Sequence, residues 1–293
     1  MNILSDRILS LEESQTIAMA RKSRELIDSG IDVISLSLGE PDFNTPDFIK
    51  DAAKKAIDNN FSHYTPVPGL SSLRDAISGK FKRDNKLDYT ADQIVASTGA
   101  KQTLAQLLMA IVNPGDEIIV PAPYWVSYFQ MVKMAEGTPI VIEATVDADF
   151  KVTAEQVEKA ITSKTKAFLF STPCNPTGSV YSKNELAELV RVFEKHSDII
   201  IISDEIYEHI NFMGEHISIG QFDSIKDRVV TVNGVSKGFA MTGWRVGYLG
   251  APKWLAAACN KMQGQTTSAT CSIAQKATEA AVLADPICTK DMR

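Results

Sequence analysis

The chain has 293 residues, 44% of them hydrophobic and 23% charged, and a formal net charge of −6. This composition is typical of a globular protein with one large domain or two smaller ones. The acidic balance argues against nucleic acid as a main partner, and no apolar run is as long as a membrane span. We therefore expect a cytoplasmic protein that binds neither nucleic acid nor a membrane.

The first 45 residues differ in pattern from the rest. A helix is predicted from about residue 13 to residue 29, it ends at Gly30, and a short strand follows. A loop rich in turn-forming residues comes next, over 39–46. We interpret residues 1–45 as an N-terminal arm with a segment of a smaller domain, and 46–293 as a large α/β domain.

Beyond residue 90, apolar strand patterns alternate with helix patterns. Two of the helices begin with the capping-box pattern, at Thr153 and at Ser182. Apolar strands separated by amphipathic helices indicate a three-layer α/β/α fold with a mostly parallel sheet. The predicted strands cover 93–97, 117–120, 166–171, 198–203 and 228–233, and the predicted helices cover 101–112, 153–161 and 182–195.

The four cysteines indicate neither a disulfide framework nor a metal site. They form no CxxC pair, and their spacing to the four histidines fits no metal-ligand pattern. Free thiols in a reducing compartment are the simplest interpretation. They are Cys174, Cys259, Cys271 and Cys288.

Three predicted strands are followed by side chains capable of chemistry. Asn175 follows the first, Asp204 and Tyr207 follow the second, and Lys237 follows the third. Because the carboxyl ends of strands in an open α/β sheet form the ligand crevice, these groups are predicted to converge.

Lys237 is the most informative of these residues. The small Gly238 beside it leaves room for its amine to reach a carbonyl carbon, and Arg245 lies eight positions later. An arginine can hold a phosphate with two parallel hydrogen bonds. Together they suggest pyridoxal 5'-phosphate held as a Schiff base, although the short Ser-Lys-Gly window alone also fits a surface lysine.

Other residues have roles that this cofactor requires, each with an ordinary alternative. Asp204 could keep the pyridine nitrogen protonated, or simply close a strand. Tyr207 lies three residues after Asp204, on a predicted helical turn, and could donate to the ring oxygen or simply be a buried aromatic residue. Asn175 could donate to the same oxygen or be an ordinary turn residue. Trp125 could stack on the ring or belong to the core.

A phosphate group needs backbone N–H groups and positive charge. A helix N-terminus after the strand at 93–97 offers such N–H groups with little steric bulk. The candidate phosphate-binding residues are Gly99, Ala100, Lys101, Ser236 and Arg245.

Seven motifs in a fixed order carry a family resemblance over essentially the whole chain. They are SLSLGEPDF at 35–43, YTPVPG at 64–69, STGAK at 97–101, PYW at 123–125, NPTG at 175–178, SDEIY at 203–207, and SKG with GWRVG over 236–247. The chain resembles class I pyridoxal-phosphate aminotransferases of fold type I, most closely the bacterial aspartate aminotransferases.

The resemblance implies roles for these residues. Lys237 would be the Schiff-base lysine and proton shuttle, with Asp204 at the ring nitrogen. Asn175 and Tyr207 would contact the ring oxygen, and Trp125 would stack on the ring. The phosphate would be held by Ala100, Ser236 and Arg245.

The resemblance also implies substrate and subunit contacts. The Gly39 backbone would meet the substrate carboxylate, with Trp125 and Asn175 nearby. Lys101 resembles the lysine that recognises a distal substrate carboxylate, although a solvated lysine at a helix start is equally consistent. Tyr64 resembles a tyrosine that reaches the partner's phosphate across a homodimer interface.

The implied reaction is ping-pong amino transfer from an amino acid, with aspartate favoured, to a 2-oxo acid such as 2-oxoglutarate. An aromatic or broad-specificity aminotransferase and a C–S β-lyase are alternatives on the same cofactor. The family continues into a C-terminal part, with an arginine for the substrate α-carboxylate, so we expect a fragment or a truncated protein. A catalytically silent cofactor-binding module and a generic phosphate-binding domain are the alternatives from other classes.

Overall fold

The computed structural model describes residues 3–36 and 38–292, so position 37 of the SLSLGEPDF motif lies outside the described residues. None of the helices in this part of the chain has the length and apolar character that crossing a bilayer requires.

Seven strands form one sheet in the order β1-β7-β6-β5-β4-β2-β3. Neighbouring strands from β6 to β3 are parallel, whereas β7 runs antiparallel to both β6 and β1. The predicted mostly parallel sheet is thus confirmed, and β3 and β7 are strands that the sequence patterns had not indicated. The strands are β1 (Ile94–Ser97), β2 (Glu117–Ala122), β3 (Thr138–Glu143), β4 (Thr165–Ser171), β5 (Ile200–Asp204), β6 (Val229–Gly234) and β7 (Gly247–Gly250).

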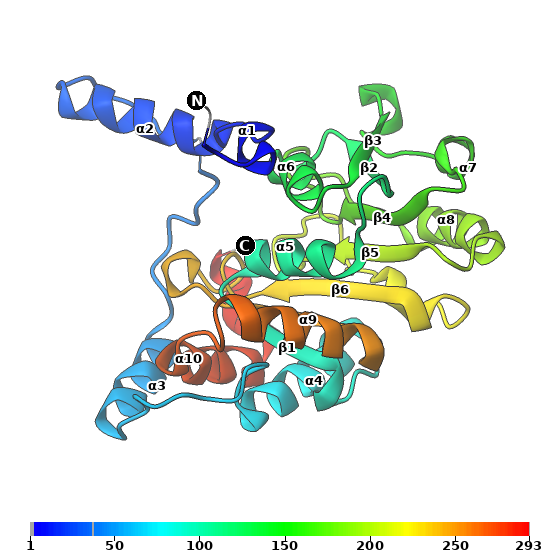
Figure 1. The fold of residues 1–293 in the computed structure, drawn as a ribbon. Helices are drawn as coiled ribbons and strands as arrows, with labels where there is room; N and C mark the ends of the chain where they lie inside the picture. Colours follow the sequence, from blue (N-terminus) through cyan, green and yellow to red (C-terminus); the bar gives the residue numbers. More distant parts are fainter. Residues whose placement is uncertain (1–2, 37, 293) are drawn as a thin grey trace.

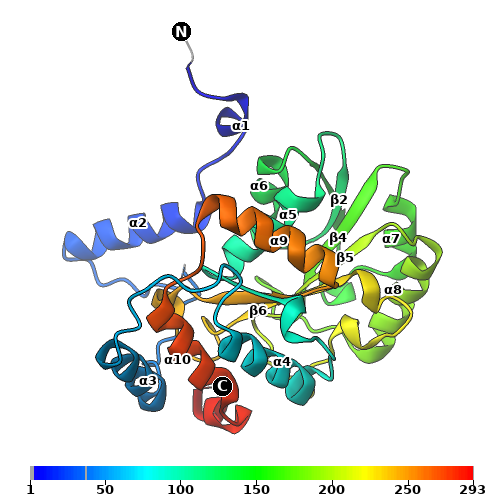
Figure 2. The same ribbon diagram turned by 60° about the horizontal axis from the view of Figure 1, so that its bottom comes forward.

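Helices cover both faces of this sheet (Figure 1). One face packs against α5, α6 and α9, and the other packs against α7 and α8 at one end and α3, α4 and α10 at the other. Figure 2 shows α9 beside α5, with α10 and α4 at the opposite side of β6. The helices are α1 (Asp6–Leu9), α2 (Gln15–Asp28), α3 (Asp47–Asp58), α4 (Ser71–Asn85), α5 (Ala100–Ile111), α6 (Ser127–Met134), α7 (Ala154–Ala160), α8 (Lys183–Lys195), α9 (Lys253–Thr266) and α10 (Ser272–Leu283).

The strand side chains alternate between the two faces. Ile200 and Ile202 of β5 join the core beneath α5, while Ile201 joins the core beneath α8. A continuous run of isoleucines therefore marks a strand that is buried on both sides, as expected for a central parallel strand. Both predicted capping boxes are present, at Thr153 before α7 and at Ser182 before α8.

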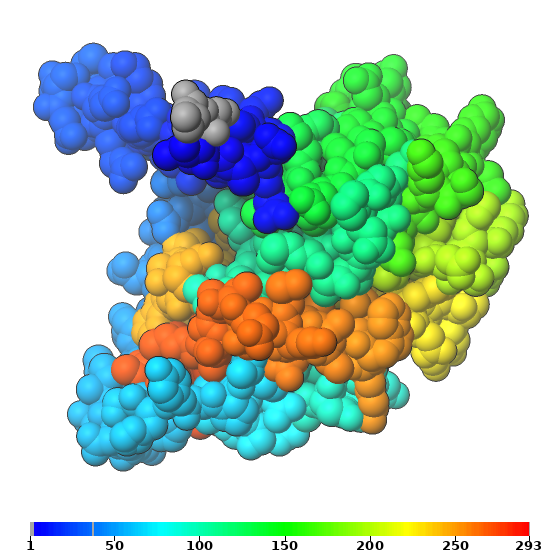
Figure 3. All heavy atoms as spheres, in the orientation of Figure 1, coloured from blue at the N-terminus to red at the C-terminus, as the bar shows by residue number. Residues whose placement is uncertain are grey.

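The beginning of the chain lies apart from this core. In Figure 3 α2 projects from the body, and α1 lies beside α6. The strand predicted after Gly30 was wrong, because residues 31–36 adopt no regular structure and pair with no strand. Ile34 and Leu36 are more than four-fifths exposed, so this segment lacks the neighbour whose hydrogen bonds a strand requires. The division at residues 45 and 46 stays a prediction.

Candidate active site

A cavity of about 860 Å³ opens at the carboxyl ends of the central strands. It is lined by groups from β5, from the turn after β6 and from the loop after β4, together with the N-terminal segment. The predicted convergence is therefore observed. Of the predicted site residues, those lining it are Gly39, Ala100, Lys101, Trp125, Asn175, Asp204, Tyr207, Ser236, Lys237 and Arg245.

Asp204 is the last residue of β5, and its carboxyl group is buried. The Tyr128 hydroxyl donates to its Oδ2 at 2.7 Å, and the Ile206 backbone N–H donates to its Oδ1 at 3.3 Å. Burial, with a smaller contribution from the Glu205 charge, raises the pKa of Asp204 to about 6 against the lowering effect of these two donors. A cation placed against this carboxylate, such as a protonated ring nitrogen, would favour the ionised form.

Lys237 lies in the turn that follows β6. Its Nζ donates to the Gly39 carbonyl at 2.8 Å and is 5.8 Å from the centre of the Tyr207 ring. Burial lowers the pKa of this amine, the Glu40 carboxylate acts in the opposite direction, and Arg245 lowers the pKa further. A lysine with a lowered pKa is more often neutral, the form that can attack a carbonyl or take up a proton.

The structure gives Gly238 a different role from the one expected. A Cβ at this position would lie 2.6 Å from Cδ2 of His209, so the glycine makes room for that ring rather than for chemistry at Lys237.

Tyr207 and Asn175 meet at one side of the cavity. The Asn175 Nδ2 donates to the Tyr207 Oη at 3.1 Å. Tyr207 lies in a non-helical turn, so the predicted helical turn was wrong, yet its side chain lines the same cavity as Asp204. Burial, with the Asp204 charge next, raises the pKa of Tyr207 to about 12, so its phenol remains a donor.

The predicted phosphate residues gather at the start of α5. Gly99 is the N-cap of this helix with φ of 84°, and a Cβ there would lie only 2.4 Å from Nη2 of Arg245. The guanidinium also donates to the Thr242 carbonyl at 2.8 Å. A backbone without side-chain bulk, a helix N-terminus and an arginine thus form a cradle that suits a phosphate. These residues fit the phosphate end of pyridoxal phosphate.

Two of the predicted contacts have distinct surroundings. Lys101 Nζ lies 4.8 Å from the centre of the Trp125 ring, and burial, followed by the Arg245 charge, lowers the pKa of this amine. Tyr64 does not line the cavity and is fully exposed.

Tyr128 is a site residue that the sequence interpretation missed. It belongs to α6, is almost completely buried, and lies edge-on to Trp125 with ring centres 5.6 Å apart. The available signal was its spacing, three residues after Trp125. Its bond to Asp204 joins positions 76 residues apart and could be found only from the fold.

Replacing Asp204 by asparagine should stabilise the cofactor-free protein at alkaline pH. The folded-state pKa is raised from 3.8 to about 6, so this carboxyl favours folding below about pH 4, and that contribution is lost as the pH rises through 6. Asp204→Asn should therefore raise the free energy of unfolding at pH 8 by on the order of 2 kcal/mol, a gain that shrinks towards pH 4. Urea unfolding across this range measures it.

Asp198→Asn is the matched control, because Asp198 is exposed and lies just before the opposite end of β5. It should change the free energy of unfolding by less than about 0.5 kcal/mol. A loss of stability in Asp204→Asn at pH 8 would contradict the inferred cost of burying this charge.

Comparisons with known proteins agree with this geometry. The family described as aminotransferase class I and II matches residues 31–293. An aspartate/prephenate aminotransferase from Cereibacter sphaeroides is 50% identical over 279 residues, which are 94% of this chain and 70% of that protein. A probable aspartate/prephenate aminotransferase from Rickettsia bellii is 48% identical over the same shares of the two chains.

Solved structures give the same result. The aspartate aminotransferase of Rhizobium meliloti superposes with a TM-score of 0.95 at 39% identity, covering 100% of this chain and 74% of that one. The Thermus thermophilus aspartate aminotransferase with maleate gives 0.93 at 42% identity, covering 96% and 73%. The chain therefore belongs to the class I and II aminotransferases, and it is an enzyme of the pyridoxal-phosphate-dependent kind.

Proposed function

We propose that the protein transfers an amino group from aspartate to a 2-oxo acid such as 2-oxoglutarate. The observation that carries the proposal is that Asp204 and Lys237 line one cavity beside the cradle formed by Gly99 and Arg245. These groups match a cofactor with a basic ring nitrogen, an aldehyde and a phosphate. The names of the relatives support aspartate as the donor.

Each part of the cofactor has a proposed holder. Arg245, Ser236 and the N–H groups at Ala100 would bind the phosphate. Asp204 would pair with the ring nitrogen, and Tyr128 would keep that carboxylate oriented. Trp125 would cover one face of the ring.

Lys237 would move the proton. When bound, pyridoxal phosphate supplies an electron-withdrawing ring that accepts the electron pair left on the substrate Cα. The neutral Nζ of Lys237 would take the proton from that Cα and hold it for return during the same transfer. Tyr207 and Asn175 would donate to the ring oxygen.

Aspartate requires a cation for its side-chain carboxylate, and Lys101 is the proposed one. Its amine lies at the cavity wall over Trp125, where burial has removed part of its hydration. The dicarboxylate maleate accompanies the similar Thermus thermophilus structure, which supports a site for two carboxylates. Gly39, Trp125 and Asn175 would contact the substrate backbone end.

Prephenate is a second candidate substrate, as an amino acceptor. Several relatives between 46% and 50% identical carry both aspartate and prephenate in their names. Measuring amino transfer from aspartate to prephenate and to 2-oxoglutarate separates the two acceptors.

We also propose that the protein acts as a cytoplasmic homodimer in which Tyr64 reaches the partner's phosphate site. The complete exposure of Tyr64, and the exposed apolar side chains of α1 and α2, support a partner surface. Sedimentation equilibrium tests the dimer.

The proposed cytoplasmic location is supported by the four free cysteines, which are consistent with a reducing compartment. We also propose that residues 1–45 form the arm and that 46–293 form the cofactor-binding domain.

Lys237→Ala should abolish amino transfer while leaving the protein folded. Removing the proton carrier should lower the single-turnover rate with aspartate by at least about 100-fold. Borohydride reduction of the wild-type holoenzyme followed by peptide mass mapping should place the cofactor mass on Lys237. Lys261→Ala is the control, since that lysine lies in α9 outside the cavity. Cofactor mass on another lysine would refute the assignment, whereas a correct adduct without keto-acid formation would reject only the proposed reaction.

Gly99→Ala should weaken cofactor binding. The added methyl group would meet the Arg245 guanidinium at 2.4 Å, at a backbone φ of +84° that favours glycine. The guanidinium must then move away from the phosphate, and we expect the Kd for pyridoxal phosphate to rise about tenfold, or 1.4 kcal/mol. Fluorescence titration of the cofactor-free protein measures this.

Gly79→Ala provides the control for the added methyl group. Gly79 lies within α4, and a Cβ there would meet nothing within 4 Å. This variant should keep the wild-type Kd and be slightly more stable, because alanine favours a helix over glycine. An unchanged Kd in Gly99→Ala would show that the phosphate binds elsewhere.

A further inference from the structure

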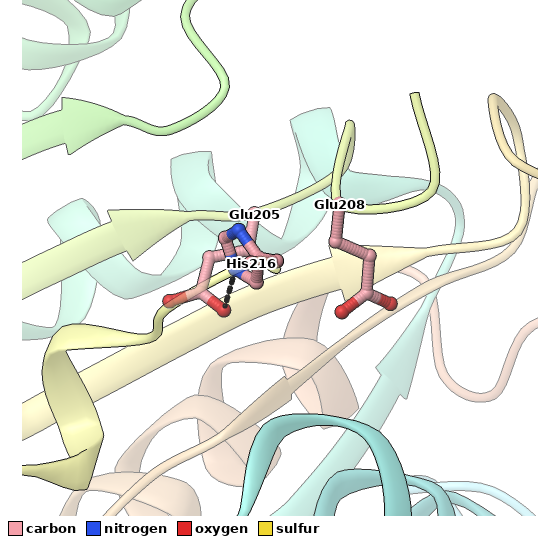
Figure 4. Close-up of side chains that lie close together, drawn as sticks. All are labelled: Glu205, Glu208 and His216. Carbon is pink, nitrogen blue, oxygen red and sulfur yellow. Dashed lines mark hydrogen bonds and ion pairs between the residues drawn. The ribbon is translucent and has the colours of Figure 1, made fainter. Parts of the chain in front are cut away.

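A buried cluster of charged side chains lies next to the segment that carries Asp204 and Tyr207. We call it the rear cluster, and it contains Lys80 and Asn85 of α4 together with Glu205, Glu208 and His216. Figure 4 shows the last three of these side chains. Lys80, Asn85 and Glu208 are at most 8% exposed, so their mutual contacts replace contacts with water.

The cluster has two hydrogen-bonded halves. In one half Lys80 Nζ forms an ion pair with Glu208 and donates to Asn85 Oδ1 at 2.7 Å, while Asn85 Nδ2 donates to Glu208 Oε2 at 2.6 Å. In the other half Glu205 binds His216 Nε2 at 2.8 Å, as the dashed line in Figure 4 marks.

The ligand atoms of Glu205, Glu208 and His216 lie within 4.8 Å of one another, a spacing that would suit a metal ion. However, the Glu208 carboxylate already forms an ion pair with the ammonium group of Lys80, and the Glu205 carboxylate is already hydrogen-bonded to the His216 ring. Burial raises the pKa of Glu208, but Lys80 and His209 outweigh it and lower that pKa to about 2. The carboxylate is therefore ionised and matched by protein cations, and we assign no metal here.

The rear cluster and the active site are connected through one short stretch of chain. Asp204, Ile206 and Tyr207 line the cofactor cavity, whereas Glu205 and Glu208 bind the rear cluster instead. The Glu208 N–H donates to the Glu205 carbonyl at 3.0 Å, which closes a turn around Tyr207. Side chains anchored on both sides of Tyr207 thus restrict the position of its phenol.

We propose that Glu208, held by Lys80 and Asn85, is a positioning residue that fixes Tyr207 against Asn175 and thereby strengthens cofactor binding. The proposal depends on the cofactor role proposed for Tyr207 and not on the identity of the amino donor. Glu208 acts through the turn that it shares with Tyr207. In metal sites, residues that hydrogen-bond to the ligating side chains change the metal affinity by about tenfold or more without touching the metal, and we expect an effect of that size here.

A double-mutant cycle on cofactor affinity tests this coupling. The Kd for pyridoxal phosphate is measured for wild type, Glu208→Gln, Tyr207→Phe and the double variant. Glu208→Gln should raise the Kd about tenfold, as judged from the effects of such partners in other sites. The double variant should bind no more weakly than the weaker single variant. Multiplying effects, or an unchanged Kd in Glu208→Gln, would overturn the proposal.

A spectroscopic readout distinguishes positioning from a loss of stability. If Glu208 acts through Tyr207, the pH midpoint of the bound cofactor's visible absorbance should shift in the same direction in Glu208→Gln and Tyr207→Phe. A midpoint that moves only in Tyr207→Phe would contradict the proposal. Because neither titration nor Kd requires turnover, a wrong amino donor would not affect the result.

Arg228→Met is the control for general destabilisation. Arg228 lies just before the amino end of β6, away from the cavity. Its guanidinium donates to the backbone carbonyls of Phe193, His196 and Ile199, between the last turn of α8 and the start of β5. Its loss should lower the unfolding temperature and leave the Kd unchanged. If the Kd rose as much in Arg228→Met as in Glu208→Gln, the weaker binding of both variants would be explained by lost stability, and the proposal would be overturned.

A second variant covers the case in which Glu208→Gln does not fold, since it leaves the Lys80 ammonium without its counter-charge. The triple variant Lys80→Met/Asn85→Leu/Glu208→Leu replaces the buried ion pair and its amide partner by apolar side chains, and such replacements often preserve stability. It should fold and bind the cofactor about tenfold more weakly than wild type, the same effect that we expect for Glu208→Gln. Wild-type affinity in this variant would refute a role for the polar cluster.

Discussion

The buried carboxylate of Asp204 is the constraint on which the site depends. A charge at the end of a central strand is costly, and the raised pKa of Asp204 reflects that cost. The protein offers only neutral donors there, the Tyr128 hydroxyl and a backbone N–H, among the described residues. A carboxylate that lacks a protein cation favours a ligand that brings one, and a basic ring nitrogen meets this need. The stability that the folded chain gives up at Asp204 is thus available as binding energy for the cofactor.

The topology of the sheet explains how distant segments reach this carboxylate. Parallel strands β4, β5 and β6 end at one edge, which brings Asn175, Asp204 and Lys237 together. The phosphate cradle arises differently. Antiparallel pairing of Ser97 with Gly247 places the end of β1 beside the start of β7, so Gly99 and Arg245 meet. One reversed strand in an otherwise parallel sheet therefore brings together the residues of the proposed phosphate site.

Sequence patterns predicted the parts of this arrangement that depend on local order. The isoleucine run of β5, the capping boxes and the residues after each strand follow from periodicity and turn chemistry, and the sequence motifs added the family. Two side-chain pairs between segments far apart in sequence escaped prediction. Tyr128 with Asp204, and Lys80 with Glu208, 128 residues apart, are ordinary residues until the fold brings them together. The prediction of a strand after Gly30 was wrong because an apolar pattern does not reveal whether a partner strand lies beside it.

The charges around the cavity indicate why an anionic cofactor fits. The cavity is lined by three cationic side chains, Lys101, Lys237 and Arg245, and by two carboxyl groups, Glu40 and Asp204. Arg245 forms no ion pair within the part of the chain that the structure describes. Arg245 also lowers the pKa of both lysines, as a nearby cation must. A phosphate bound at Arg245 would cancel this influence and raise both values, while burial would continue to lower them. The lowered pKa of the Lys237 amine is therefore due chiefly to burial in the cavity.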